Sequence, residues 1–207
     1  MNEKRQQQLQ QELAKMMSGR LYHASDNELL LDLLAKCHET CFRYNHLRPS
    51  CQADRDRIMR QLLGKTGQRF KIISPFLCDY GFNITIGEDF FANTNLVILD
   101  EATVTFGDNV FIAPNCAFYT AEHPLDVKLR NAGMQSARPI VVGNNVWIGG
   151  NVSVMPGVTI GHNVVIGAGS VVVNDVPDNV LAVGNPCRVV RVIHNDCQAA
   201  DGANVAG

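Results

Sequence analysis

This sequence has no long apolar segment and no block of basic charge. No apolar run approaches the length of a membrane-spanning helix, and the charged start of the chain has no apolar stretch behind it. Lysine and arginine number 18 against 20 aspartate and glutamate residues, with no basic run beyond Lys4-Arg5. We therefore expect a cytoplasmic protein that binds neither membranes nor nucleic acid.

The sequence also lacks a paired cysteine motif. Its seven cysteines are an odd number without the CxxC spacing of zinc sites, which disfavours a disulfide framework and a structural zinc site. Cys37 and Cys41 stand one helical turn apart, and we interpret them as two thiols on one face of a helix. We expect no metal to be required.

What the sequence does have is a six-residue repeat in its second half. Apolar residues recur at every sixth position, at Val142, Ile148, Val154, Ile160, Ile166 and Val172. A second apolar set lies at Val146, Val152, Val158 and Val164, and glycine follows the first set at Gly143, Gly149, Gly161 and Gly167. A period of six fits neither the turn of a helix nor the alternation of a long strand. It is typical of a parallel β-helix, in which short strands and turns stack as coils.

The first part of the chain, residues 1–69, lacks this repeat and is rich in helix-forming residues. We predict helices over 2–17 and 52–64, and between them a helix that Asp26 caps and that runs through Cys41. These helices need a surface to pack against.

From residue 70 the composition changes to β-branched and aromatic residues punctuated by Gly, Asn and Asp. We predict a β-helix domain over 70–193, with four three-sided coils at 86–103, 106–123, 142–159 and 160–177. The polar stretch 124–141 fits no repeat, and we predict that it is a loop extruded from the stack. Residues 194–207 are predicted to form a flexible tail.

A stack of about four thin coils has little interior of its own. Its flat outer faces are therefore expected to be covered by helices or by other subunits. The sequence predicts a homo-oligomer.

Several short motifs carry a resemblance to one family. They are Tyr80-Gly81-Phe82-Asn83-Ile84, Phe91-Ala92-Asn93, Ile112-Ala113-Pro114, Tyr119 to Pro124, Gly143 to Gly150, and Gly184 to Arg188. Over roughly residues 17–193 the chain resembles the galactoside and maltose O-acetyltransferases, which are sugar-acetylating hexapeptide-repeat acyltransferases. The resemblance implies a left-handed parallel β-helix, a homotrimer with active sites between subunits, and acetyl-CoA as the donor of an acetyl group to a sugar hydroxyl.

The predicted catalytic residue is a histidine. A sugar hydroxyl is a poor nucleophile at neutral pH, and a histidine that is partly neutral near pH 7 can remove its proton. Among six histidines, His123 alone ends a coil, precedes a proline and borders the extruded loop. It also coincides with the catalytic base of the family that the chain resembles.

The resemblance assigns further residues to the oxyanion and to the acceptor sugar. The backbone N–H of Gly150, just after the Trp-Ile-Gly run, is implied to stabilise negative charge on the attacked carbonyl. Asn93 is implied to bind acceptor hydroxyls, because an amide both donates and accepts hydrogen bonds. Asp100 and Glu101 are implied to contact the acceptor as well, and Asp26 is the nearest candidate for the family's N-terminal acid.

The donor needs a slot for pantetheine and positive charge for phosphates. The predicted donor-binding residues are Trp147, Gly150, Ala168, Val173, Asn174, Arg188 and Arg191. Trp147, the only tryptophan, is expected to wall the slot. Arg188 and Arg191 are expected to bind phosphates, because guanidinium groups suit phosphate recognition.

We predict direct transfer in a ternary complex, because Cys116, the nearest candidate thiol, takes an inward position in its hexapeptide. A hexapeptide carbonic anhydrase is disfavoured, since only His123 and His162 lie in the repeats and a catalytic metal needs about three protein ligands. A non-catalytic assembly protein built on the same coil is also disfavoured. It would not need a histidine, an extruded loop and terminal arginines at matching positions of the repeat. A xenobiotic or antibiotic acetyltransferase of the same fold stays the alternative.

Overall fold

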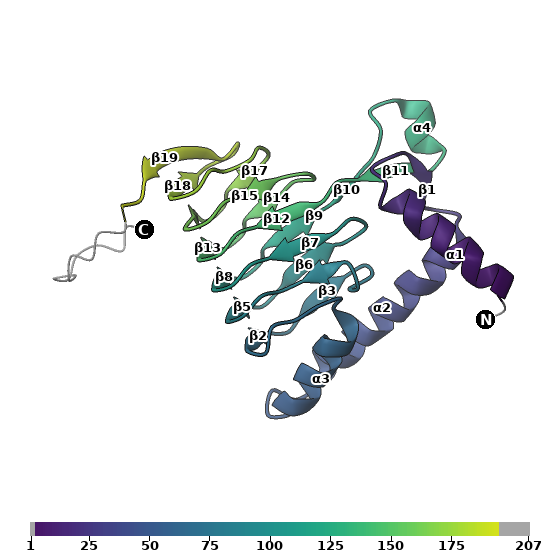
Figure 1. The fold of residues 1–207 in the computed structure, drawn as a ribbon, viewed down its shortest axis with the longest axis horizontal. Helices are drawn as coiled ribbons and strands as arrows, with labels where there is room; N and C mark the ends of the chain where they lie inside the picture. The colour runs from purple at the N-terminus through teal and green to yellow at the C-terminus, as the bar shows by residue number, and fades with distance from the viewer. Residues whose placement is uncertain (1–2, 195–207) are drawn as a thin grey trace.

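The computed structural model describes residues 3–194, so all but the first residue of the predicted tail lies outside the described residues. Three parallel sheets run along the stack of coils (Figure 1). Sheet 1 consists of β4 (Ile84–Thr85), β7 (Val104–Phe106), β12 (Ile140–Val142) and β15 (Thr159–Ile160). Sheet 2 consists of β2 (Phe70–Ile72), β5 (Phe90–Ala92), β8 (Val110–Ile112), β13 (Val146–Ile148), β16 (Val165–Ile166), β18 (Val180–Val183) and β19 (Arg188–Val192). Sheet 3 consists of β3 (Phe76–Cys78), β6 (Leu96–Leu99), β9 (Ala117–Tyr119), β14 (Ser153–Val154) and β17 (Val171–Val172).

The predicted mainly β fold, a β-helix preceded by helices, is confirmed, but the stack is longer than four coils. Sheet 2 has seven described strands, of which β19 alone is antiparallel, so six coils cross it. The added coils pass through β2 and β3 at one end and β18 at the other. Residues 79–83, between β3 and β4, interrupt the six-residue spacing. The first coil therefore does not follow the period from which the other coils were predicted.

The interior of the stack is filled by the apolar positions of the repeat. All ten valines and isoleucines of the two repeating sets are at most 2% exposed. In the earlier coils, the ring of Phe106 lies 5.2 Å from that of Phe90 and 4.9 Å from that of Phe118. Strand pairing then links each coil to the coils directly above and below it.

Asparagine turns the chain at the corners of the coils. Among the described residues, the non-glycine positions with positive φ are seven asparagines and one aspartate. Asparagine tolerates this left-handed conformation better than most residues. The amide of Asn163 links three coils, because its Nδ2 donates to Asn179 Oδ1 and its Oδ1 accepts from Asn145 Nδ2, both at 3.0 Å.

Three helices precede the stack: α1 (Glu3–Met16), α2 (Glu28–His46) and α3 (Gln52–Leu62). No helix within residues 3–194 combines the length and the apolarity needed to cross a membrane. The N-cap of α2 is Asn27 rather than the predicted Asp26, since Asn27 Oδ1 accepts from the N–H groups of Leu29 at 3.2 Å and Leu30 at 3.3 Å. Aspartate and asparagine cap about equally well, so composition did not distinguish the two neighbours.

Helices α2 and α3 lie against the first coil (Figure 1). Tyr44 Oη donates to Ile72 O at 2.6 Å, and the guanidinium of Arg55 lies 4.3 Å from the Tyr44 ring centroid. The Asn45 amide exchanges two hydrogen bonds of 2.9 Å with the backbone of Phe76. These contacts give the helical segment the packing surface that its sequence required.

The chain leaves the stack between β9 and β12, as the extruded loop predicts. Strands β10 (Ala121–Glu122) and β11 (Met134–Ala137) form an antiparallel hairpin around α4 (Val127–Asn131). The excursion is shorter than 124–141, because Ile140 already belongs to β12. Strand β1 (Tyr22–His23) adds to β11, so the N-terminal segment lies beside the loop (Figure 1).

Candidate functional site

The predicted site residues gather at two corners of the stack. Corner A, between sheets 2 and 3, carries Asn93, Gly150 and Ala168. Corner B, between sheets 3 and 1, carries Asp100, Glu101, His123, Val173 and Asn174. Within a single chain, the predicted base His123 and the predicted oxyanion donor Gly150 therefore lie at different corners.

Corner A is a column of backbone turns from successive coils. The Asn93 N–H donates to Ile112 O and the Gly169 N–H donates to Gly150 O, both at 2.8 Å. Among the hydrogen bonds formed within residues 3–194, none engages the Gly150 N–H. This donor is thus available to a ligand, which is what an oxyanion site requires.

An apolar groove of about 500 Å³ opens beside corner A. Its lining residues are Phe91, Asn93, Phe111, Ile112, Ala113 and Trp147. Strand register places Phe91, Phe111 and Trp147 side by side on the outer face of sheet 2. Phe111 is 48% exposed and Trp147 51% exposed, so the face is open to a ligand or to another subunit.

His123 lies at corner B, at the base of the extruded hairpin, and is exposed. Its Nδ1 is 3.2 Å from the carbonyl oxygen of Met134. Because a carbonyl oxygen only accepts, Nδ1 carries the proton and the neutral ring has its lone pair on Nε2. An imidazole in this tautomer can take a proton from a hydroxyl at Nε2.

Two buried acids lie at corner B in the coil before His123. Asp100 is 0% exposed and Glu101 8% exposed. Asp100 Oδ1 accepts from the N–H groups of Asp79 at 3.1 Å and Tyr80 at 2.8 Å, which fixes that turn. Asp100 therefore supports the backbone of this turn through Oδ1, whereas its Oδ2 has no hydrogen-bond partner within the described residues.

Burial changes the acidity of both carboxyl groups. It raises the pKa of Asp100 to about 7. It also raises the pKa of Glu101 to about 8, and the negative charge of Asp79 adds to that effect. Glu101 is thus largely protonated near neutral pH and can donate a hydrogen bond as well as accept one.

The pairing of β1 with β11 brings the N-terminal segment to corner B. His23 pairs with Met134, the residue whose carbonyl oxygen contacts His123. Asp26 is exposed, with its Oδ1 3.9 Å from His23 Nδ1. The structure therefore places Asp26 in the segment next to the extruded hairpin, which fits an N-terminal acid near the base.

Sequence reasoning did not find four residues at this corner: Tyr22, Asp79, Met134 and Gln135. The Gln135 amide donates to Tyr22 Oη at 2.9 Å, and both side chains are buried. Asp79 is close enough to raise the pKa of Glu101. No spacing pattern joins them, because 113 positions separate Tyr22 from Gln135.

The predicted donor-binding residues are divided between the corners. Ala168 is exposed at corner A, whereas Val173 and Asn174 are exposed at corner B. Arg188 and Arg191 are exposed on β19, at the edge of sheet 2. No one corner of this chain holds the whole set.

The Cys116 thiol is closed off from substrates. It is 1% exposed and donates to Gly149 O at 3.1 Å. Burial raises the pKa of this thiol, so the reactive thiolate is disfavoured. Cys116 is a core residue.

A six-coil β-helix with an aromatic groove, an unengaged backbone N–H and an exposed, oriented imidazole defines a hexapeptide-repeat acetyltransferase. Within that class the chain belongs to the galactoside and maltose O-acetyltransferase family. The maltose acetyltransferase hexapeptide capping motif matches residues 15–67, and the bacterial transferase hexapeptide, with six repeats, matches residues 139–174.

Two relatives support this assignment. Galactoside O-acetyltransferase of Escherichia coli K12 is 47% identical over 154 residues, covering 74% of this chain and 76% of that protein. A Saccharomyces cerevisiae relative, whose name assigns it provisionally to the acetyltransferases, is 51% identical over 181 residues, or 87% of this chain and 92% of that protein.

Solved structures agree along most of the chain. A maltose O-acetyltransferase from Clostridium difficile 630 superposes with a TM-score of 0.87 at 47% identity, covering 89% of this chain and 98% of that one. A galactoside acetyltransferase in complex with coenzyme A gives a TM-score of 0.85 at 41% identity, covering 89% of this chain and 92% of that one. The common fold thus includes both the helices and the stack.

Proposed function

We propose that this protein transfers the acetyl group of acetyl-CoA to a hydroxyl of a galactoside, glucoside or maltose-like sugar. The observation that carries the proposal is the exposed His123 imidazole, whose Nδ1 is fixed 3.2 Å from Met134 O. The galactoside and maltose acetyltransferases among its relatives support a sugar acceptor. The coenzyme A complex of one of them supports the donor.

The transfer occurs in one ternary complex. His123 Nε2 takes the proton of the acceptor hydroxyl as that oxygen attacks the thioester carbonyl. The Gly150 N–H donates to the oxyanion that forms. When the C–S bond breaks, the imidazolium returns its proton to the departing thiolate of coenzyme A. No acetyl-enzyme intermediate is required.

The acceptor and the donor contact different sets of side chains. Asn93 and the largely protonated Glu101 bind acceptor hydroxyls, with Asp26 beside the base. Asp100 acts as a positioning residue, because it holds the Asp79–Tyr80 turn through two backbone hydrogen bonds. Pantetheine runs along corner A past Trp147.

The donor's phosphates are bound at the C-terminal end of the stack. Arg188 and Arg191 are exposed there on β19, and guanidinium groups match phosphate geometry. Ala168 leaves space at corner A for the donor to approach. Val173 and Asn174, at corner B, complete the slot from a neighbouring chain.

The active protein is a homotrimer with its sites between subunits. His123 and Gly150 occupy different corners of one chain, so a complete site needs corner B of one copy against corner A of the next. Such a head-to-tail interface closes into a ring when the rotation allows it. The exposed aromatic face of sheet 2, beside corner A, supplies apolar contact area for this interface.

The activity is tested by following the release of free coenzyme A with a panel of sugars and of hydroxyl-bearing antibiotics. We expect turnover with a sugar, and His123→Ala should lower kcat by about 10²–10⁴-fold. His162→Ala is the matched control, since His162 is an exposed coil histidine that should leave kcat unchanged. Equal rates for wild type and His123→Ala would exclude His123 as the base. If only the antibiotics were acetylated, the acceptor would be an antibiotic and the proposal of a sugar acceptor would be wrong.

The shared site is tested by mixing subunits. His123→Ala and Asn93→Ala chains, each impaired alone, are unfolded together and refolded as mixed trimers. If the base and the acceptor amide come from neighbouring chains, random assortment restores about one quarter of the sites. Activity no higher than the mean of the two parents would mean that each chain carries its own complete site.

A further inference from the structure

Three cysteine side chains meet where α2 covers the first coil. Cys37 and Cys41 lie one turn apart on α2, and Cys78 ends β3 and points into the interior of the stack. Cys78 Sγ is 3.5 Å from Cys37 Sγ and 3.8 Å from Cys41 Sγ. All three sulfur atoms lie within 4.8 Å of one another, and the acetyl transfer uses none of them.

The spacing of the sulfur atoms suits a single three-coordinate ion. With metal–sulfur bonds of about 2.3 Å, three ligands in a trigonal arrangement are about 4 Å apart. Within residues 3–194, no histidine or carboxylate joins this group of ligand atoms. An all-sulfur donor set without oxygen selects soft ions and excludes magnesium and calcium.

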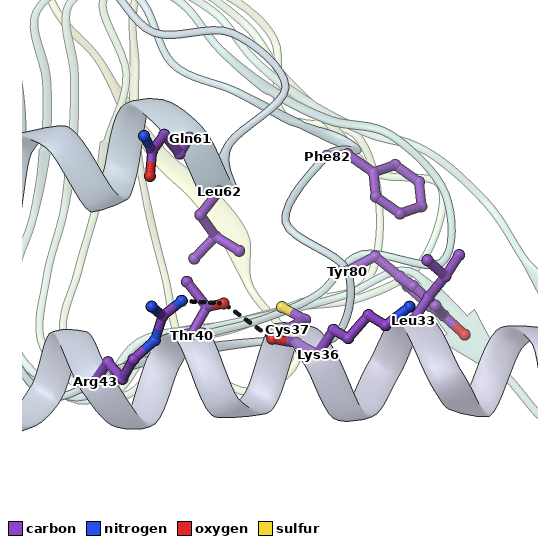
Figure 2. A pocket seen from close by; sticks show the side chains of 9 residues that line it. All are labelled: Leu33, Lys36, Cys37, Thr40, Arg43, Gln61, Leu62, Tyr80 and Phe82. Carbon is purple, nitrogen blue, oxygen red and sulfur yellow. Dashed lines mark hydrogen bonds between the residues drawn. The ribbon is translucent and has the colours of Figure 1, made fainter. Parts of the chain in front are cut away.

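Two pockets adjoin the cluster. One is lined by Cys37 of α2, and the other is lined by Cys78 of β3. Cys37 lines a pocket of about 270 Å³ together with Lys36, Tyr80 and Phe82, and Figure 2 shows its sulfur on the side of α2 that faces this pocket. Cys78 lines a second pocket of about 480 Å³ with Phe42. A small solute can therefore approach Cys37 and Cys78, whereas Cys41, at 0% exposed, lines neither pocket.

We propose that Cys37, Cys41 and Cys78 form a three-coordinate binding site for a soft, thiophilic ion, and that trivalent arsenic fits it best. The charge balance decides between soft ions. One Cu(I) on three thiolates leaves a net charge of −2, whereas trivalent arsenic on three thiolates is neutral. A buried site near the carboxylate of Asp100 disfavours uncompensated negative charge.

The binding step involves no redox change. Arsenous acid, As(OH)₃, reacts with three thiols to form three As–S bonds, and its three hydroxyl groups leave as water with the three thiol protons. The site is independent of acetyl transfer, so its test uses binding and not activity as the readout.

The first experiment is native mass spectrometry of the full chain with arsenite, after reduction by a phosphine. We expect one arsenic per chain, with a mass gain equal to one arsenic atom less three protons. Cys37→Ser, Cys41→Ser and Cys78→Ser should each lose this adduct. Cys116→Ser and Cys51→Ser, which leave the cluster intact, should keep it. A parallel titration with Cu(I) tests the charge argument. That argument is wrong if Cu(I) binds the three cysteines more tightly than arsenite does.

The second experiment avoids any folding defect in the variants. In the wild-type protein, arsenite should protect Cys37, Cys41 and Cys78 from alkylation, as mapped on peptides, and leave Cys51 reactive. The proposal is overturned if neither ion gives a 1:1 adduct, if the adduct survives in the serine variants, or if protection falls on other cysteines.

Discussion

At the scale of single residues, the proposed chemistry depends on two backbone groups as much as on side chains. Met134 O determines which nitrogen of His123 carries the proton, and the Gly150 N–H has no acceptor within residues 3–194. The six-residue repeat does not show either group, because every residue has a carbonyl and almost every residue has an N–H.

The role of Gly150 as a backbone donor can be separated from its lack of a side chain. Gly150→Ala keeps the N–H, and the added Cβ would meet nothing nearer than Pro114 O at 3.4 Å. We expect kcat to change little in this variant. Gly150→Pro removes the N–H and should lower kcat by about 10²–10³-fold. Steady-state kinetics, with circular dichroism to check folding, distinguish the two; equal loss in both variants would contradict the backbone role.

The buried Glu101 predicts how stability depends on pH. Folding raises its pKa from 4.5 to about 8, so between these values the folded chain holds its proton more tightly than the unfolded chain does. The free energy of unfolding should therefore fall as the pH rises through this window. Glu101→Gln should make the dependence shallower in urea unfolding at a series of pH values. Glu39→Gln, at an exposed position on α2, is the control, and equal slopes in the two variants would refute the assignment.

At the scale of elements, the stack is held by inward side chains that pack within a coil and against the next one. Phe90, Phe106 and Phe118 come from three different strands and form a continuous aromatic column. Phe106 contacts both of the other rings, so its removal leaves each of them without this neighbour.

Phe106→Ala tests the importance of this column. Phe106 is 1% exposed, and a large cavity in a core that cannot collapse typically costs about 3–5 kcal/mol. We expect that loss in the free energy of unfolding, measured by urea denaturation at a fixed chain concentration. Leu125→Ala, at a position 96% exposed in the extruded loop, should change it by less than about 0.5 kcal/mol. A small effect of Phe106→Ala would mean that neighbouring coils relax into the space.

At the scale of the whole molecule, the outer faces of the stack differ in character. The outward residues of sheet 1 are Thr85, Thr105, Val141 and Thr159, whereas those of sheet 2 include Phe91, Phe111, Trp147, Val165 and Leu181. A contiguous aromatic face on one side of a thin stack is typical of a surface that another subunit covers.

A charge placed on that face should separate the subunits of the proposed trimer. Phe111→Asp puts a carboxylate between Phe91 and Trp147, and burying it without a partner would be costly. We expect sedimentation to show smaller species and coenzyme A release to be lost. Val141→Asp makes the same charge change at a 41% exposed position on sheet 1 and should leave the proposed trimer intact. If the Phe111→Asp variant still sedimented as a trimer, the interface between subunits would not lie on this face of sheet 2.

The parts of the fold that follow a regular period were predictable from the sequence, and the parts that interrupt it were not. Val142 and its successors were assigned to the interior correctly, since a period of six repeats along the chain. The first coil was missed because residues 79–83 break that period. The cap of α2 was misplaced by one residue, because Asp26 and Asn27 are adjacent and both suit a cap.

What the sequence determined by itself was the β-helix, the excursion after His123 and the resemblance that led to the family. These signals are local: each depends on residues a few positions apart, as the geometry of strands and turns requires. Only the tertiary structure brought β1 to β11, placed His123 and Gly150 at different corners, and added Cys78 to Cys37 and Cys41. Such contacts join residues far apart in the chain, because they arise from packing between elements, and no local period records them.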